Sequence, residues 1–410
     1  MSTASATGID TRAPLHPSYP RFRRLLEKIA AGASERDRTL TLPHEQIRWL
    51  ADAGVTRLRL PQADGGGGLS LPEVFKLVID LAAADSNVAH ILRVHFAFLE
   101  LVLHNPDPVQ RQRWVERINA GAIVGNAISE QNGRTIGLDD PSTITTALVP
   151  DDDGGYRLNG EKFYSTGTLF ATWVRVLGIT PDNARAFITL PTNRDGVELH
   201  DDWDGFGQSL TGTGTSSFHN VRVETDEVEL IPDGEDPPTY QGAHFQLYLQ
   251  ALSAGILAAV RDDAVALVRG RARNFSHAAE PIPRQDPQVL QVVGEIAADA
   301  EAAEAIVLHA AAVLQQASDS VRDGLPDPDA AQAAQLASAK AKVAVDRFSY
   351  ATAARLFDAG GASATQAAKN LDRHWRNLRT ISTHNPTFLK ASAIGDHLAN
   401  GTRPPSNGYF

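Results

Sequence analysis

The sequence predicts an α+β fold, mostly α, in which a small antiparallel β domain separates two helical regions. Apolar residues recur at helical spacing up to Gly121, where glycine, threonine and β-branched residues take over in alternating runs. Long alanine-rich periodic segments begin near Tyr240. We therefore expect an N-terminal helical domain at residues 1–122, a β domain at 123–238 and a C-terminal four-helix bundle at 239–410.

Helix-end signals place three helices in the N-terminal domain, at about 43–54, 70–81 and 86–105. Ser70 and Glu73 have the spacing of a capping box at the start of the second helix. The third helix carries two histidines, His90 and His95, and ends at an Asn-Pro pair.

In the β domain, Asn159-Gly160 lies between two short alternating runs and predicts a hairpin turn. Further strands are expected at 173–179, 186–190 and 217–223. The helices of the C-terminal bundle are expected at 243–273, 289–320, 330–357 and 367–380. Because alanine-rich helix faces pack closely, we also expect a homo-oligomer, either a homotetramer or a dimer of dimers.

Composition and charge exclude several functions. The formal net charge is −11, which disfavours nucleic acid as a partner, and the absence of cysteine rules out disulfides and thiolate metal sites. The N-terminus lacks a signal-peptide pattern, and the apolar run Ala89 to Leu103 is too short to span a membrane. We therefore expect a soluble, cytoplasmic protein with no membrane partner.

Common catalytic and nucleotide-binding motifs are missing. The glycine run 65–68 does not match GxGxxG, His44-Glu45 is followed by Arg48 rather than completing HExxH, and neither a Walker A sequence nor GxSxG occurs. No metal site is predicted. An oxidoreductase with this sequence would receive its electrons from a substrate or from another protein.

Three stretches, in this order, resemble the acyl-CoA dehydrogenase superfamily: Gly125-Asn126-Ala127-Ile128-Ser129-Glu130, the run from Leu158 to Gly167, and the arginine-rich run from Arg373 to Thr380. Within the superfamily, the chain is most similar to the two-component monooxygenase branch, which includes dibenzothiophene monooxygenase and sulfur-acquisition oxidoreductases. Asp201-Asp202-Trp203-Asp204-Gly205-Phe206-Gly207-Gln208 and His384-Asn385-Pro386 carry that closer similarity.

The resemblance implies a monooxygenase that uses reduced flavin supplied by a separate NAD(P)H-dependent reductase. Reduced flavin, FMN rather than the alternative FAD, would react with O2 to a C4a-hydroperoxide, which transfers one oxygen atom to a small or medium apolar substrate, with organosulfur compounds as candidates. Alternatives are an N-hydroxylase or aromatic hydroxylase of the same branch, an acyl-CoA dehydrogenase with a displaced base, and a non-catalytic flavin-binding protein.

One chemical argument separates these classes. An acyl-CoA dehydrogenase needs a carboxylate base to remove the α-proton, and the commonest members have a glutamate just after the arginine-rich helix. Residues 381–387 of this chain contain no carboxylate, and Asn385 cannot accept a proton. Dehydrogenation from this position is therefore disfavoured.

The resemblance also implies two catalytic histidines. His384 is expected to be a proton donor or base beside the flavin, although from sequence alone a structural histidine at a helix end is more common. His95 is assigned to the active site by the same resemblance, against the alternative of a core histidine, and His90 is expected to be structural.

Further residues are assigned to the flavin site by resemblance. Tyr164 and Thr166 lie two positions apart, so a strand would place them on one face, with Tyr164 stacking on the ring and Thr166, also a catalytic candidate, near N5. Asn126, Ser129 and Trp203 are expected to contact the ring or the substrate.

Arg273 is expected to bind a flavin phosphate, across a subunit boundary in many relatives, and Gly360-Gly361 resembles a diglycine turn near the cofactor. The residues after that turn, Ala362-Ser363-Ala364, lack an arginine that some relatives have there.

Overall fold

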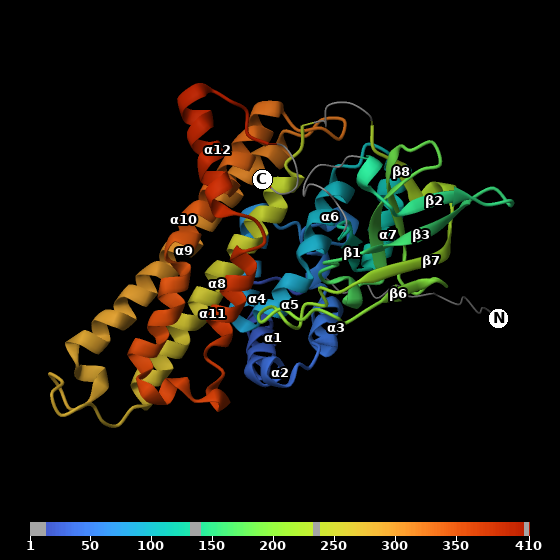
Figure 1. Cartoon of the computed structure of the whole chain (residues 1–410). Coiled ribbons are helices and arrows are strands. Elements are labelled where there is room, and N and C mark those ends of the chain that lie inside the picture. Colours follow the sequence, from blue (N-terminus) through green and yellow to red (C-terminus); the bar gives the residue numbers. More distant parts are fainter. Residues whose placement is uncertain (1–13, 132–140, 233–237, 406–409) are drawn as a thin grey trace, which may run out of the picture.

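The computed structural model describes residues 14–131, 141–232, 238–405 and 410. Within these ranges, long helices form one side of the molecule, the β-sheet lies on the other, and the N-terminal helices lie between them (Figure 1). The N-terminal helices are α1 (Pro20–Ala31), α2 (Ala33–Thr39), α3 (His44–Asp52), α4 (Leu71–Ala84), α5 (Ser86–Ile91), α6 (Arg93–Leu103) and α7 (Pro108–Asn119).

Two of the predicted N-terminal features can be compared directly with the structure. The capping box is present at the start of α4, where the Glu73 carboxylate accepts a 2.7 Å hydrogen bond from the backbone N–H of Ser70. The helix predicted from Ser86 is interrupted at Leu92, whose ψ of 0° departs from α-helical geometry. By length and composition Ser86–Leu103 is a candidate membrane span, but 89% of it is buried inside the protein, as in a core helix.

The middle region is an eight-stranded sheet. Its strands are β1 (Val124–Ala127), β2 (Ala147–Pro150), β3 (Tyr156–Lys162), β4 (Trp173–Ile179), β5 (Arg185–Pro191), β6 (Val197–Leu199), β7 (Ser216–Val223) and β8 (Val228–Leu230). The order is β6-β7-β3-β2-β4-β5-β8, and β1 pairs with β4. β1 and β2 each run parallel to β4, so the sheet is mixed, whereas the other pairings are antiparallel as predicted.

The hairpin predicted at Asn159-Gly160 is wrong. Both residues lie inside β3, at a bulge where the pairing with β7 shifts register between Leu158 and Gly160. Gly160 has a φ of +149°, and a Cβ there would lie 2.4 Å from Oγ1 of Thr146. Asn159 Oδ1 accepts a 2.8 Å hydrogen bond from the backbone N–H of Asn220. The Asn-Gly pair therefore accommodates a close strand contact rather than a chain reversal.

The C-terminal region contains α8 (Gln241–Gly270), α9 (Pro287–Asp319), α10 (Pro328–Gly360), α11 (Arg373–Ser382) and α12 (Thr387–Asn400). The helices α8, α9 and α10 pack against one another, and α4 packs against α8 and α9. The fourth predicted helix, α11, begins at Arg373 rather than 367, because Ala362–Thr365 and Ala367–Lys369 form 3-10 turns.

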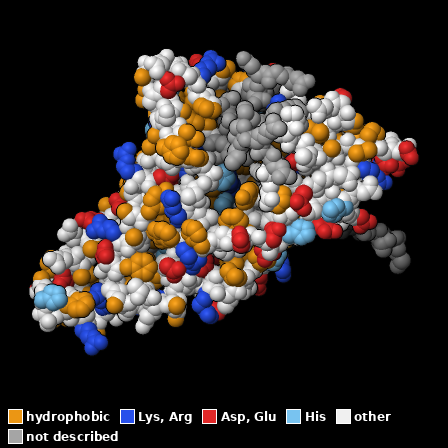
Figure 2. All heavy atoms as spheres, viewed as in Figure 1, with side chains coloured by type: hydrophobic (Ala, Val, Ile, Leu, Met, Phe, Trp, Pro, Cys, Tyr) orange, Lys and Arg blue, Asp and Glu red, His pale blue; other side chains and the backbone are white. Residues whose placement is uncertain are grey.

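The two hydrophobic cores meet at β1. Val124 belongs to the large core shared by the helical regions, whereas Ala127 belongs to the smaller core of the sheet. Because side chains alternate along a strand, Asn126 shares the face of Val124 and is directed toward the helices. On the surface, a deep hollow separates the helical side from the β domain, and pale-blue histidine atoms are visible at its base (Figure 2).

Candidate active site

Tyr164 and Thr166 belong to a turn rather than to a strand, contrary to the prediction. β3 ends at Lys162, and Tyr164 has a left-handed φ of +56°. The turn is held to the following loop, because the N–H groups of Ser165 and Gly167 donate to the carbonyls of Gly214 and Thr211. A Cβ on Gly167 would lie 2.3 Å from the Ile91 carbonyl oxygen, so this glycine allows the turn to touch the end of α5.

Two aromatic side chains, the exposed Tyr164 and the half-buried Trp203, form a pair beside this turn. The rings of Tyr164 and Trp203 are 6.1 Å apart at an interplanar angle of 74°, an edge-to-face arrangement. Tyr164 is 62% exposed, which is unusual for a large ring on a rigid turn. The Trp203 indole N–H donates to the carbonyl of Gly207 at 3.2 Å, which fixes the tryptophan on its loop. The pair offers an apolar wall to a flat ligand.

Asn126 offers an unused polar atom on β1. Its backbone N–H and C=O are both bonded to the hydroxyl of Thr168, at 3.0 and 2.7 Å. Its side-chain Oδ1 is buried and has no hydrogen-bond partner among the described residues. Such an oxygen costs about 1–3 kcal/mol if it is left unsatisfied. A ligand with an N–H donor fits this position.

Ser129 and the neighbouring Glu130 fix the chain beside the turn. The Ser129 carbonyl accepts a 2.8 Å hydrogen bond from the Phe163 N–H. Burial opposes ionisation of Glu130, but hydrogen bonds from Lys162 and Thr145 outweigh it and lower the pKa of Glu130 to about 2. The carboxylate is therefore an anchor for Lys162, at 2.6 Å, and for the start of β2.

The histidine of the third predicted helix that lies near the cleft is His90, which the sequence interpretation took as structural. Its Nδ1–H donates to Oε1 of Gln208 at 2.8 Å, whereas its Nε2 is buried without a hydrogen-bond partner in the described parts of the chain. Burial, and then the charge of Arg93, lower the pKa of His90 to about 3. The ring is therefore neutral and presents an unprotonated Nε2.

His384 lies in the turn between α11 and α12, close enough to His90 and Arg93 for their charges to affect it. Burial and then Arg93 hold the pKa of His384 well below its ordinary value, although the side chain is solvent-exposed. The side chain is therefore surrounded by many protein atoms and is still open to solvent on one side. Nη1 of Arg93 donates to His384 Nε2 over a long 3.4 Å, which leaves Nδ1 to carry the proton of the neutral ring.

Arg93 itself was not identified from the sequence as a functional residue. It is 8% exposed, and its Nε donates to the Phe245 carbonyl on α8 at 3.1 Å. Asn385, beside His384, donates from Nδ2 to Oε1 of Gln246 at 2.6 Å. The α11–α12 turn is thus held against α6 and α8 by polar contacts, and an amide occupies the place after His384.

The surroundings of His95 favour a structural role over the catalytic role predicted for it. Its side chain is fully buried, Nε2–H donates to the Thr56 carbonyl at 2.7 Å, and Nδ1 accepts from the Val124 N–H at 3.3 Å. Burial lowers the pKa of His95 to about 4. Both ring nitrogens are used to join β1 to the N-terminal region, so His95 is a core histidine. The sequence alone could not separate the roles of the two histidines, because His90 and His95 lie in one apolar segment.

Arg273 is not brought to the cleft within one chain. It is exposed in the loop after α8, whereas Phe245, which contacts Arg93, lies near the start of that helix. At 1.5 Å per helical residue, the two positions are about 40 Å apart. Gly361 lies at the same distant end, where Nη1 of Arg271 donates to the Ala359 carbonyl at 2.8 Å. The predicted phosphate-binding elements therefore gather away from the predicted ring-binding residues.

Gln208 connects the two walls of the cleft and was also missed by the sequence analysis. It is 2% exposed, its backbone N–H donates to Asn377 Oδ1 at 2.6 Å, and its side-chain Nε2 donates to Ser86 Oγ at 3.0 Å. Arg376 of the arginine-rich α11 also holds this loop, by donating to the Phe206 carbonyl at 3.0 Å. Gln208 could have been identified from the sequence, because it ends the run 201–208 that carries the similarity to the two-component monooxygenase branch.

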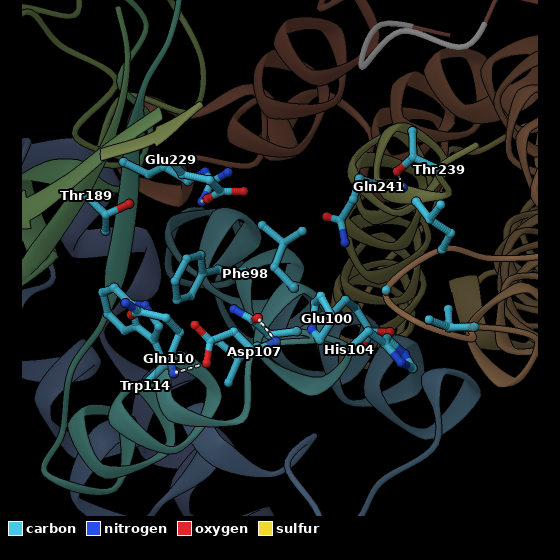
Figure 3. Close-up of a pocket in the computed structure, with 18 of the residues that line it drawn as sticks. Phe98, Glu100, His104, Asp107, Gln110, Trp114, Thr189, Glu229, Thr239 and Gln241 are labelled. Atoms are coloured by element: carbon cyan, nitrogen blue, oxygen red, sulfur yellow. Dashed lines mark hydrogen bonds and ion pairs between the residues drawn. The ribbon is translucent and has the colours of Figure 1, made fainter. Parts of the chain in front are cut away.

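A separate cavity of about 560 Å³ lies between α6, α7, the β5–β8 edge and the start of α8. Side chains from these elements, including Phe98, Thr189 and Gln241, border the same space (Figure 3). None of the predicted site residues lines it. We place the candidate site in the cleft that contains His90, Tyr164 and His384, because the polar and aromatic groups converge there.

The helix–sheet–helix order and the named relatives of the chain place it among the flavin-dependent oxidoreductases. Residues 21–122 match the acyl-CoA dehydrogenase N-terminal domain, and residues 247–387 match the C-terminal domain. The chain belongs to the acyl-CoA dehydrogenase superfamily, in its branch of two-component flavin monooxygenases.

Relatives of the chain support this placement over its whole length. It is 30% identical to the probable FMNH2-dependent monooxygenase SfnC of Pseudomonas putida, covering 97% of this chain and 98% of that protein. Two solved structures each superpose with a TM-score of 0.85: TdsC from Paenibacillus sp. A11-2 with FMN and indole, at 27% identity, and methanesulfinate monooxygenase MsuC from Pseudomonas fluorescens, at 29%. They cover 94% and 95% of this chain and 98% of each relative.

Proposed function

We propose that this protein is a reduced-flavin-dependent monooxygenase that inserts one oxygen atom from O2 into a small or medium apolar substrate, with organosulfur compounds as the favoured class. The observation that carries the proposal is the cleft beside the 163–167 turn. There, the Tyr164–Trp203 pair lies with the neutral His90 and His384, and residues 383–387, directly after α11, contain no carboxylate. Dibenzothiophene monooxygenases, about 30% identical over 93% of the chain, favour sulfur as the oxygenated atom.

FMN is the proposed cofactor, and the residues present fit it. Asn126 Oδ1, a buried acceptor, suits a flavin N–H group, and the Tyr164–Trp203 pair suits the face or edge of the ring system. Ser129 and Thr166 lie on the two segments that are joined by the Phe163–Ser129 hydrogen bond, so they would border the same ring. Bound in the reduced state, FMN supplies the electrons that activate O2.

The two histidines have different proposed tasks. Burial, and then the charge of Arg93, keep His384 neutral, so that its imidazole can exchange a proton with the reacting atoms. His90, with its proton on Nδ1 held by Gln208, offers Nε2 as an acceptor. The aromatic pair would limit access of water to the reacting atoms.

We further propose that the site is completed by a second subunit and supplied by a second protein. Arg273 and the Gly360-Gly361 turn share the far end of the bundle, about 40 Å from the cleft. A phosphate held by Arg273 would therefore belong to the flavin of a neighbouring copy, as in a homotetramer or dimer of dimers. A separate NAD(P)H-dependent reductase would provide the reduced FMN, because the sequence has no nicotinamide motif.

The test is rapid mixing of the protein with anaerobically reduced FMN, followed by oxygenated buffer. A transient absorbance that belongs to neither reduced nor oxidised flavin is expected before oxidised FMN appears. Reoxidation at the rate of free reduced FMN, with binding confirmed separately, would contradict the monooxygenase. Bleaching of bound oxidised flavin by an acyl-CoA, without a reductase, would instead support the acyl-CoA dehydrogenase alternative.

A further inference from the structure

Three threonine hydroxyls form a hydrogen-bonded chain that ends at the proposed flavin site. Oγ1 of Thr211 lies 2.8 Å from the backbone carbonyl of Gln208, Oγ1 of Thr213 lies 2.6 Å from that of Thr211, and Oγ1 of Thr166 lies 2.8 Å from that of Thr213. Thr211 is fully buried, and the other two are half-buried.

The direction of this chain is fixed by its first member. A carbonyl oxygen can only accept, so Thr211 must donate its single hydroxyl proton to Gln208. Thr211 can then only accept from Thr213, and Thr213 can only accept from Thr166. The Thr166 proton is therefore committed to Thr213, and Thr166 offers only lone pairs to any further partner.

The backbone keeps the three hydroxyls in place. Gly212, between Thr211 and Thr213, has a φ of +58°, and a Cβ on Gly214 would lie 1.8 Å from the His200 carbonyl oxygen. The Gly167 N–H donates to the Thr211 carbonyl at 2.9 Å, so the two segments that carry the hydroxyls are also joined through the backbone. The two glycines of the Thr-Gly-Thr-Gly run at 211–214 thus allow the backbone conformation that holds the threonine hydroxyls in place.

We propose that this threonine chain makes the protein select reduced over oxidised flavin. The inference rests on the proposed function, in which Thr166 borders the flavin ring, and on the position near N5 that the family resemblance implies for Thr166. N5 of reduced flavin carries a hydrogen and donates, whereas N5 of oxidised flavin has only a lone pair and needs a donor. An acceptor-only Thr166 satisfies the first form and opposes the second. Thr211 and Thr213 act through Thr166 and are positioning residues.

The experiment compares anaerobic binding of reduced and oxidised FMN to the full-length protein and its variants. Wild type is expected to bind reduced FMN more tightly. Thr213→Val keeps the side-chain shape but frees the Thr166 proton to point at N5, so the ratio of the two dissociation constants should shift about tenfold toward oxidised FMN. Thr213→Ser, which retains the hydroxyl, should keep the wild-type ratio.

The possible results separate a failure of this inference from a failure of the proposed function. An unchanged ratio in Thr213→Val, with both flavin forms still bound, overturns the inference and leaves the proposed function intact. If wild type binds neither form of FMN, the proposed function fails and the inference with it. Thr211→Val is the second variant if Thr213→Val does not fold, because loss of the Thr211 hydroxyl removes the fixed direction and should shift the ratio the same way.

Discussion

Nδ1–H of His90 donates a 2.8 Å hydrogen bond to Oε1 of Gln208, and this single contact fixes the tautomer of a histidine whose Nε2 is otherwise unpaired in the described structure. Gln208 is itself held by Asn377 of α11 and Ser86 of α5. The arginine-rich helix therefore acts on the cleft through this loop, and its polar residues need not contact a ligand to affect the site.

Replacing Gln208 by leucine should lower kcat by about ten- to a hundredfold, with a smaller effect on KM, because His90 loses the acceptor that sets its tautomer. Nitrogen-15 spectra of labelled histidine provide the readout, since they separate the two neutral tautomers. Gln208→Glu keeps an acceptor and adds a negative charge, so the His90 pKa should rise from its low value. Unchanged histidine signals in both variants would contradict the positioning role.

Substitution of the two histidines chosen from the sequence should affect different properties: activity for His384 and stability for His95. His384→Ala should reduce product formation by about 10²-fold or more while FMN binding and stability are retained. His95→Phe should instead lower the free energy of unfolding by about 2–4 kcal/mol, because the Thr56 carbonyl and the Val124 N–H lose their partner. Steady-state turnover and chemical denaturation of both variants make the comparison, and a stable, inactive His95→Phe would restore His95 to the site.

Much of the fold could be predicted because local signals agreed with it. The Ser70–Glu73 capping box, the strand at 173–179 and the long helices of the bundle all carry their own periodicity or end signal. The Asn159-Gly160 hairpin failed because β7 pairs across the whole of β3, a long-range contact that overrides the local turn preference. No pattern along one strand reveals such a partner.

The site was predicted less well, for a related reason. His90 and His95 differ only in which neighbours the fold brings to them: a glutamine from position 208 or two backbone groups of the core. The roles proposed for Arg93 and for the hydroxyls of Thr211 and Thr213 depend on contacts with residues far away in sequence. The aromatic and hydroxyl residues at 164–166 were found by resemblance, but the strand assumed for them is a turn.

Subunit complementation tests whether Arg273 serves a neighbouring copy. Arg273→Ala and His384→Ala should each be inactive, whereas chains refolded or coexpressed together should recover activity that neither has alone. Recovery is expected because a mixed oligomer contains sites with an intact His384 from one chain and an intact Arg273 from the other. As a control, Arg273→Ala mixed with wild type should give no more activity than the wild-type chains supply. Absence of recovery in mixed oligomers of verified composition would place both residues in one chain's site or remove Arg273 from it.

Lys390 should make the protein less stable as the pH falls toward neutrality. It is 2% exposed on α12, and burial, followed by the charge of Lys342, lowers its pKa to about 7. Between this value and the ordinary lysine pKa, the unfolded chain binds more protons than the folded one, so the free energy of unfolding rises with pH through that window. Lys390→Met should remove this slope, so the free energy of unfolding of the variant relative to wild type should rise as the pH falls to about 7.

The matched control for Lys390→Met is Lys342→Met, in the same buried group. Lys342 donates 2.9 Å hydrogen bonds to Asp346 and to the Ser382 carbonyl, so its loss leaves a buried carboxylate without its charged partner. Lys342→Met should therefore destabilise the protein by about 3–5 kcal/mol. Denaturant unfolding from pH 6 to pH 9.5 measures both effects. A free energy of unfolding that has the same pH dependence in wild type and in Lys390→Met would show that Lys390 does not titrate in this window.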